Sequence, residues 1–155
     1  MGENEEIKIA VRNRKAKHDY QIHWTIEAGI ELHGCEVKSI RDGKINISDA
    51  YAVIENGQAW LKNLHISPYE MDSSNTPYDP IRPRRLLLHK REIRKLSIQT
   101  DQKGMTIVPL AIYFRNKLAK VELAVATGRK KYDKRQAVAK AEADRRMRKA
   151  IRKDM

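Results

Sequence analysis

The stretch YAVIENGQAWLKNL, residues 51–64, decides the fold class. Residues 51–54 are all apolar, and residues 59–61 and 64 are apolar again, and short apolar runs bounded by turn residues are typical of strands. Between them stands Asn56-Gly57, the pair most favoured where a type I′ turn needs two positive φ angles. The stretch therefore predicts an antiparallel β-hairpin, and a mainly β protein around it.

Further strands are predicted on both sides of this hairpin. Their residues are 7–12, 20–32, 105–114 and 118–126. Gly29 predicts a bulge or bend in the second of them, and Pro109 predicts an edge position or a bulge in the third. Six or seven short antiparallel strands at this spacing are typical of a small closed barrel. Barrels that bind oligonucleotides are built in this way, but the fold alone does not give the function.

The segments between the strands predict few helices. Residues 86–98 predict a helix, since a run of leucines is followed by apolar residues at helical spacing. Residues 37–41 predict a short helical turn, and Gly34 before them predicts a tight turn. We expect residues 14–17 to be a basic linker and residues 67–83, with four prolines, to be a loop.

The charge of the chain is strongly positive and unevenly placed. The 155 residues hold 32 Lys and Arg against 20 Asp and Glu, a net charge of +12. Residues 129–155 carry twelve basic and four acidic side chains, which is +8 of that total. A field of this sign attracts polyanions, of which nucleic acid is the commonest.

Because the charge is concentrated in residues 129–155, we predict that the chain has two parts. These are an RNA-binding β-barrel domain at 1–128 and a basic tail at 129–155. In the tail, a narrow apolar stripe at spacing four consists of Ala139, Ala143, Met147, Ile151 and Met155. That stripe is too small to dock firmly, and the neighbouring cations repel one another. We expect the tail to be disordered when free and helical when bound to phosphates. A membrane-surface helix would need Trp, Phe or Leu anchors, which the tail lacks.

The pattern of reactive residues argues against an enzyme. The seven glycines are scattered, and no two histidines stand at metal-binding helical spacing. Only Glu27, Glu31 and Glu36 resemble a set that a metal-dependent nuclease could use, and Glu36 lies beyond a turn. His23 and His33 are expected at the surface or rim. We therefore expect no catalytic residue, no metal, no cofactor and no small-molecule substrate.

Cys35 is the only cysteine, so no intrachain disulfide or thiolate zinc site can form, and we expect a buried, inert thiol. The first six residues are polar and acidic, unlike a secretory signal, and no run approaches the ~18 apolar residues of a membrane span. These features indicate a cytoplasmic protein.

Five motifs stand in order along the chain. They are Asn13-Arg14-Lys15-Ala16 with His18-Asp19-Tyr20, Glu27-Ala28-Gly29-Ile30, Gly34-Cys35-Glu36-Val37-Lys38-Ser39 with Arg41 and Gly43, Arg84-Arg85-Leu86-Leu87-Leu88-His89-Lys90, and the stretch from Gly128 to Arg135. Together, over roughly residues 7–135, they resemble the SsrA-binding protein (small protein B) family. Any one of them alone would be a weak signal.

The resemblance implies a non-catalytic partner of transfer-messenger RNA in trans-translation, the rescue of stalled ribosomes. The implied fold is an antiparallel barrel related to the OB-fold, with flanking helices. The barrel would bind the tRNA-like domain at its elbow, where the protein body replaces the missing anticodon arm. The basic tail would enter the empty mRNA channel. A ribosomal protein with a basic tail would explain the charge and barrel, but not the ordered motifs.

The resemblance also implies roles for single residues. Glu27 and Leu87 match the RNA-binding face, and His89 falls where many members have Asn. The basic residues of the same motifs, Arg14, Lys15, Lys38 and Arg41, are further RNA-binding candidates. In the tail, Tyr132 and Asp133-Lys134-Arg135 match the part of the family that engages the ribosomal decoding site. Leu87 belongs to a run of three leucines, so a place in the core is the alternative for it.

Overall fold

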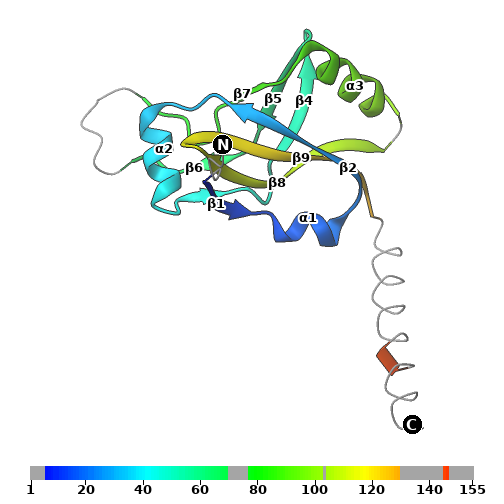
Figure 1. Ribbon diagram of the computed structural model, residues 1–155, viewed down its shortest axis with the longest axis horizontal. Coiled ribbons are helices and arrows are strands. Elements are labelled where there is room, and N and C mark those ends of the chain that lie inside the picture. Colours follow the sequence, from blue (N-terminus) through cyan, green and yellow to red (C-terminus); the bar gives the residue numbers. More distant parts are fainter. Residues whose placement is uncertain (1–5, 70–76, 103, 130–144, 147–155) are drawn as a thin grey trace, which may run out of the picture.

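Antiparallel sheet dominates the structure (Figure 1), a computed structural model that describes residues 6–69, 77–102, 104–129 and 145–146. The strands are β1 (Ile7–Arg12), β2 (Tyr20–Ile30), β3 (Ile45–Asn46), β4 (Tyr51–Glu55), β5 (Gln58–Lys62), β6 (His65–Ile66), β7 (Arg84–Leu87), β8 (Met105–Arg115) and β9 (Leu118–Gly128). The longer helices are α1 (Arg14–Asp19), α2 (Gly34–Arg41) and α3 (Lys90–Thr100). The prediction of a mainly β fold with a few helices is confirmed.

The main sheet is organised around β8 and β9, which pair along most of their length. Its strand order is β1-β8-β4-β5-β7-β2-β9, and β9 pairs in addition with β8. The pairings from β8 through β4, β5, β7, β2 and β9 therefore return to β8, while β1 is attached outside this ring. The short strands β3 and β6 form a separate pair.

Both two-residue hairpin turns follow the same backbone rule. The predicted hairpin forms between β4 and β5, with φ of 51° at Asn56 and 73° at Gly57. The turn between β8 and β9 also has two positive angles, 49° at Asn116 and 69° at Lys117. Positive φ at both central residues matches the right-handed twist of the paired strands.

Of the two predicted bulges, one is confirmed and one is wrong. The register of β8 shifts between Pro109 and Ala111, so Pro109 stands at a bulge, where its missing N–H interrupts the ladder least. The bulge in β2 falls between Ile22 and Trp24, and Gly29 stays in register. Gly29 instead serves close packing, because a Cβ there would lie 3.2 Å from the Cβ of Leu87.

The predicted helix over 86–98 is wrong at its start. Arg84 and Leu86 are buried while Arg85 and Leu87 are exposed, which is the period of a strand, and these four residues form β7. The helix α3 begins only after His89, whose backbone N–H donates to Glu92 Oε1 at 2.9 Å. The run of leucines belongs to the strand and its exit, and it misled the helical interpretation.

Two shorter segments also differ from prediction. Residues 14–17 lie in a helix, not a linker, because the Asn13 side chain accepts from the backbone N–H of Ala16 at 3.1 Å and caps α1. Gly34 begins α2 and does not form a tight turn, since Glu36 accepts from the backbone N–H of His33 at 2.8 Å. Both starts depend on side-chain caps.

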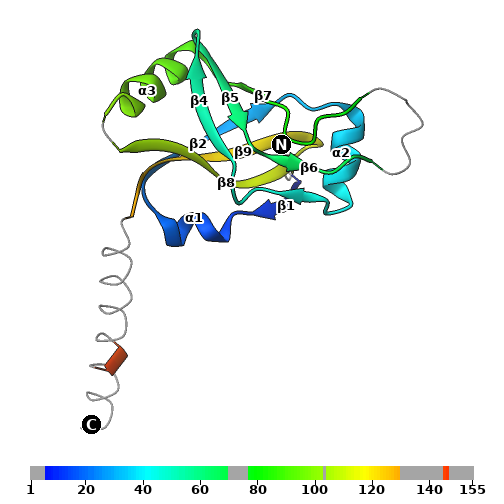
Figure 2. The same cartoon turned by 180° about the vertical axis from the view of Figure 1, so that it is seen from behind.

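The core lies inside the ring of strands, and a second cluster lies outside it. The inner cluster includes Leu61, Ile112 and Leu123, all fully buried. The outer cluster joins Ala16 of α1 to Val108, Leu110, Ala124 and Ala126 of β8 and β9. The helix α1 thus covers one end of the outer sheet surface and leaves the rest open (Figure 2). No helix in the described ranges is long and apolar enough to span a bilayer.

Candidate nucleic-acid interface

Cross-strand register collects one set of side chains on the outer surface of five strands. Leu87 pairs with Gly29, Gly29 with Lys120, Lys120 with Tyr113, and Tyr113 with Ile9. Directly paired residues project to the same side of a sheet. Their neighbours Ile112 and Phe114 point into the core, which confirms the direction. We call this surface the open face; its side chains include those of Ile7, Ile9, Glu27, Leu87, Tyr113, Arg115 and Lys120.

Glu27 is held in position at the centre of the open face. The Tyr113 hydroxyl and Arg115 Nη2 both donate to Glu27 Oε2, the latter at 2.8 Å. Burial, together with the hydrogen bond to Glu27, raises the pKa of Tyr113 to about 12, so the phenol stays a donor near neutral pH. Among the described residues both bonds end on Oε2, which leaves Oε1 able to accept from a partner.

Leu87 is exposed, so the alternative that placed it in the core is wrong. Its side chain is 48% exposed, whereas that of Leu86 is 2% exposed and belongs to the inner cluster. Leu87 lies directly against Gly29, the residue opposite it on β2. An exposed leucine two positions along the open face from Glu27 offers an apolar contact next to a polar one.

His89 and α1 mark two ends of this surface. His89 is exposed at the N-terminus of α3, two residues beyond Leu87. At the other end, a depression of about 400 Å³ around Glu27 adjoins one of about 390 Å³ lined by Arg14 and Lys17. The two depressions share Arg12, Ala111 and Glu122. Arg14 therefore lies on a basic rim of the open face, together with Arg12 and Lys17.

Three of the basic candidates lie elsewhere. Lys15 lies 3.9 Å from Asp49 and does not line either depression. Lys38 lies on α2, with its Nζ 5.5 Å from the centre of the Tyr69 ring. Arg41, also on α2, lies 5.6 Å from the ring centre of Phe114, a residue that points to the opposite side from Tyr113. The structure does not bring these three to Glu27.

Several residues of the open face and of its basic rim were missed from the sequence. They include Ile7, Ile9, Tyr113, Arg115 and Lys120 on the face, and Arg12 and Lys17 at the rim. The alternation along β1 predicted that Ile7 and Ile9 share a side, but not that this side is exposed. The contact of Tyr113 and Arg115 with Glu27 depends on the register of β8 against β9 and of β9 against β2, and no local pattern carries that register.

Unlike Glu27 and Glu31, Glu36 is buried, and its carboxylate pairs with arginines. It is 1% exposed, and Arg84, which is fully buried, donates Nε to Glu36 Oε2 at 2.8 Å. Arg82 Nε donates to the same oxygen at 3.1 Å, as does the Tyr78 hydroxyl at 3.2 Å. Burial favours the neutral acid, but the bonds from Arg82, the His33 backbone and Arg84 outweigh it and lower the pKa of Glu36.

The three glutamates of the nuclease alternative, Glu27, Glu31 and Glu36, do not lie together in the structure. Within the described ranges, no group of three His, Cys, Asp or Glu side chains is placed to hold a metal ion. Glu36 bonds to arginines, and Glu27 bonds to Tyr113 and Arg115. Glu27, Glu31 and Glu36 therefore do not form a common site.

Three side-chain predictions outside the interface can also be judged. His23 and His33 are exposed as expected, and His23 shares a hydrogen bond of 3.1 Å with Thr127 Oγ1. Cys35 is partly exposed, not buried, because the first turn of α2 directs the neighbouring Glu36 inward instead. The tail candidates Tyr132, Asp133, Lys134 and Arg135 lie outside the described residues.

The fold and the site together define a class, that of small, mainly β proteins that present an exposed sheet surface with a positioned carboxylate and a basic rim. Comparison with known proteins identifies the particular group. The family model described as "SmpB protein" matches residues 10–153, and the chain belongs to this family. The resemblance seen in the ordered motifs is confirmed.

Named relatives match almost the whole chain. The SsrA-binding protein of Halothermothrix orenii (strain H 168 / OCM 544 / DSM 9562) is 52% identical over 152 residues, 98% of this chain and 97% of its own. That of Carboxydothermus hydrogenoformans (strain ATCC BAA-161 / DSM 6008 / Z-2901) is 54% identical over 145 residues, 94% of this chain and 97% of its own. A chain from a solved structure described as "tmRNA-SmpB: a journey to the center of the bacterial ribosome" matches with a TM-score of 0.66. It is 48% identical and covers 83% of this chain and 93% of its own.

Proposed function

We propose that this protein binds the tRNA-like domain of transfer-messenger RNA and delivers it to stalled ribosomes for trans-translation, as a non-catalytic adaptor. The observation that carries the proposal is the near-complete match, at about half of all positions, to proteins named for SsrA binding. A solved relative whose description joins tmRNA to SmpB and the bacterial ribosome supports the same partners. Action on the ribosome would place the protein in the cytoplasm.

The open face is the surface that binds the RNA in this proposal. Elbows of folded RNA expose unstacked bases that side chains can contact and hydrogen-bond. Glu27 Oε1 accepts from a base amino group, while Tyr113 and Arg115 keep the carboxylate fixed. Leu87 packs against a base or sugar, and His89 donates or stacks beside it. Arg12, Arg14 and Lys17 on the rim attract phosphates.

The sheet and the tail divide the work. The closed order of pairings supports a small barrel of the OB kind for residues 1–128. The +8 of charge in residues 129–155 supports a separate tail that follows the rRNA of the empty mRNA channel and orders as a helix there. Tyr132 with Asp133-Lys134-Arg135 engages the decoding site. Lys15, Lys38 and Arg41 lie away from Glu27 and contribute to RNA binding from other surfaces.

Recovery of bound RNA from cells tests the proposal. The full-length chain, purified at moderate salt, should enrich transfer-messenger RNA over bulk tRNA, and binding should weaken steeply as salt rises. Glu27→Gln should reduce that enrichment, whereas Glu55→Gln, which changes an exposed glutamate on the β4–β5 hairpin, should not. Equal recovery of transfer-messenger RNA and bulk tRNA by the unaltered protein would overturn the assignment.

A further inference from the structure

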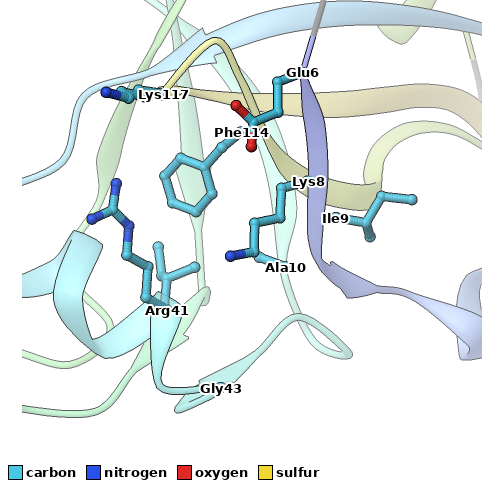
Figure 3. Close-up of a pocket in the computed structure, with 9 residues that line it drawn as sticks. Glu6, Lys8, Ile9, Ala10, Arg41, Gly43, Phe114 and Lys117 are labelled. Carbon is cyan, nitrogen blue, oxygen red and sulfur yellow. The ribbon is translucent and has the colours of Figure 1, made fainter.

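A separate pocket lies between β1, α2 and the turn that joins β8 to β9 (Figure 3). Its volume of about 380 Å³ is near the lower end of the range for ligand pockets, about 300–1,000 Å³. Lys8 and Arg41 lie on either side of the Phe114 ring, and Lys117 stands at the edge of the pocket. The pocket touches the open face only through Ile9, which lines both.

The charge of this pocket suits an anion. Three cations, Lys8, Arg41 and Lys117, line it together with one carboxylate, that of Glu6. Within the described part of the chain, none of the three cations has a carboxylate within 4.0 Å. A concave site with two more positive than negative side chains concentrates an anionic ligand. Unpaired cations close together repel one another, and a bound phosphate would relieve that repulsion.

The floor of the pocket supplies a planar surface. Phe114 is 7% exposed and Ile40 beside it is 2% exposed, so both are fixed by the core. The Arg41 guanidinium lies over the Phe114 ring, 5.6 Å from its centre. A guanidinium held beside a fixed ring offers a planar cation to the pocket that it lines, and such planes are platforms on which unpaired bases stack.

The backbone conformation at Lys117 gives an independent indication that its side chain has a function in the pocket. Lys117 has φ of 69°, a conformation that glycine adopts without cost and lysine adopts with strain. At the equivalent place in the other hairpin, after Asn56, the chain has Gly57. A lysine in place of the favoured glycine lowers the stability of the turn and adds a cation to the pocket, and strained residues of this kind concentrate at functional sites.

We propose that this pocket binds one unpaired nucleotide of RNA. Its phosphate lies between Lys8 and Lys117, and its base stacks on Arg41 above Phe114. The pocket is too small to admit a duplex, so it would contact a bulged, looped or single-stranded nucleotide. The proposal rests on the proposed function in assuming an RNA partner, but it adds a second contact on a different surface from Glu27.

Binding of hexauridylate, an unstructured RNA, tests the pocket directly. The unaltered full-length protein should bind it, measured by fluorescence anisotropy, and the backbone amide signals of Ala10, Gly43 and Lys117 should shift in NMR spectra. Lys117→Gly should weaken binding about tenfold while the melting temperature stays equal or rises, because the glycine relieves the turn. Arg41→Gln should weaken it similarly, and Arg94→Gln, an equal charge change on α3, should alter it less than about twofold.

Two further experiments distinguish this pocket from the proposed RNA interface at Glu27 and from a site for free nucleotides. Glu27→Gln should leave hexauridylate binding unchanged while it weakens binding of the tRNA-like domain, so failure of the RNA assignment and failure of the pocket are distinguishable. Uridine monophosphate alone should bind far more weakly than hexauridylate; equal affinity would show a site for free nucleotides and overturn the proposal. Equal losses for Lys117→Gly, Arg41→Gln and Arg94→Gln would also overturn it, since they would indicate attraction by overall charge alone.

Discussion

The carboxylate of Glu27 receives both of its donors on one oxygen, so its position is fixed before any RNA arrives. Side chains that are already fixed lose less conformational entropy on binding than mobile ones. In the proposed interface, Tyr113 and Arg115 therefore serve as positioning residues for Glu27. Neither was identifiable from the sequence, where Tyr113 is an ordinary outward residue of a strand.

Removing the phenol oxygen tests this positioning role. We expect Tyr113→Phe to weaken binding of the tRNA-like domain about tenfold, near the lower end of what a charge-assisted hydrogen bond contributes. Tyr51→Phe, on the exposed side of β4, is the matched control and should leave the dissociation constant unchanged. Equal affinity of the Tyr113→Phe and unaltered proteins in a filter-binding assay would refute the role.

The same tyrosine predicts an alkaline dependence of stability. The pKa of Tyr113 rises from 10.0 to about 12 in the folded protein, so folding favours the protonated phenol. Its contribution to stability is complete below about pH 10 and is lost as the pH rises from 10 to 12. Urea unfolding over this range should show a steeper loss for the unaltered protein than for Tyr113→Phe. Parallel curves would show that the phenol does not titrate abnormally.

Adjacent leucines of β7 should respond in opposite ways. Leu86→Ala removes a core side chain and should lower the free energy of unfolding by about 2–5 kcal/mol. Leu87→Ala should leave the melting temperature nearly unchanged and weaken RNA binding, because Leu87 is exposed beside Glu27. Thermal unfolding and RNA titration on the same samples separate the two effects. A large loss of stability in Leu87→Ala would contradict the assignment of Leu87 to the interface.

At the scale of elements, prediction succeeded where local pattern determines the structure. The hairpin at Asn56-Gly57 and the long strands β8 and β9 needed only short apolar runs and the turn residues between them. The helix α1 was missed and the start of α2 was placed too late, because both starts depend on side-chain bonds, from Asn13 and Glu36. The exposure of Leu87 and the bonds to Glu27 were beyond prediction, since both depend on which distant strands are paired.

Glu36 connects α2 to β7 and to the segment before it, so its loss should affect several elements together. Glu36→Gln leaves Arg84 buried without its counter-ion and should destabilise the protein by about 3–5 kcal/mol. Glu31→Gln, an exposed neutralisation nearby, should cost little. Because the pKa of Glu36 is lowered, its contribution is present above about pH 4.5 and is lost as the pH falls further. Urea unfolding at pH 7 and at pH 4 should show the difference between the two variants shrinking in acid.

At the scale of the whole molecule, the proposed division between body and tail predicts separable losses. A chain truncated after Gly128 should stay folded and still bind the tRNA-like domain, with some affinity lost because +8 of charge is removed. It should fail in alanine transfer to a stalled nascent chain. Replacing Asp133, Lys134 and Arg135 together by alanine should give the same separation with a smaller change of charge. Transfer at the full-length rate would show that the tail only adds attraction.

The order of strands has a further consequence for how the molecule is made. The last strand, β9, closes the ring by pairing with both β2 and β8. Tyr20, at the start of β2, pairs with Gly128, at the end of β9, so the two residues are far apart in the sequence. During synthesis the edge of β2 that pairs with β9 therefore stays unpaired until β9 itself has left the ribosome. Contacts between residues so far apart in sequence also make folding slow, on the millisecond-to-second scale of barrel proteins. The nascent chain should therefore acquire protease resistance only after β9 has emerged from the ribosome.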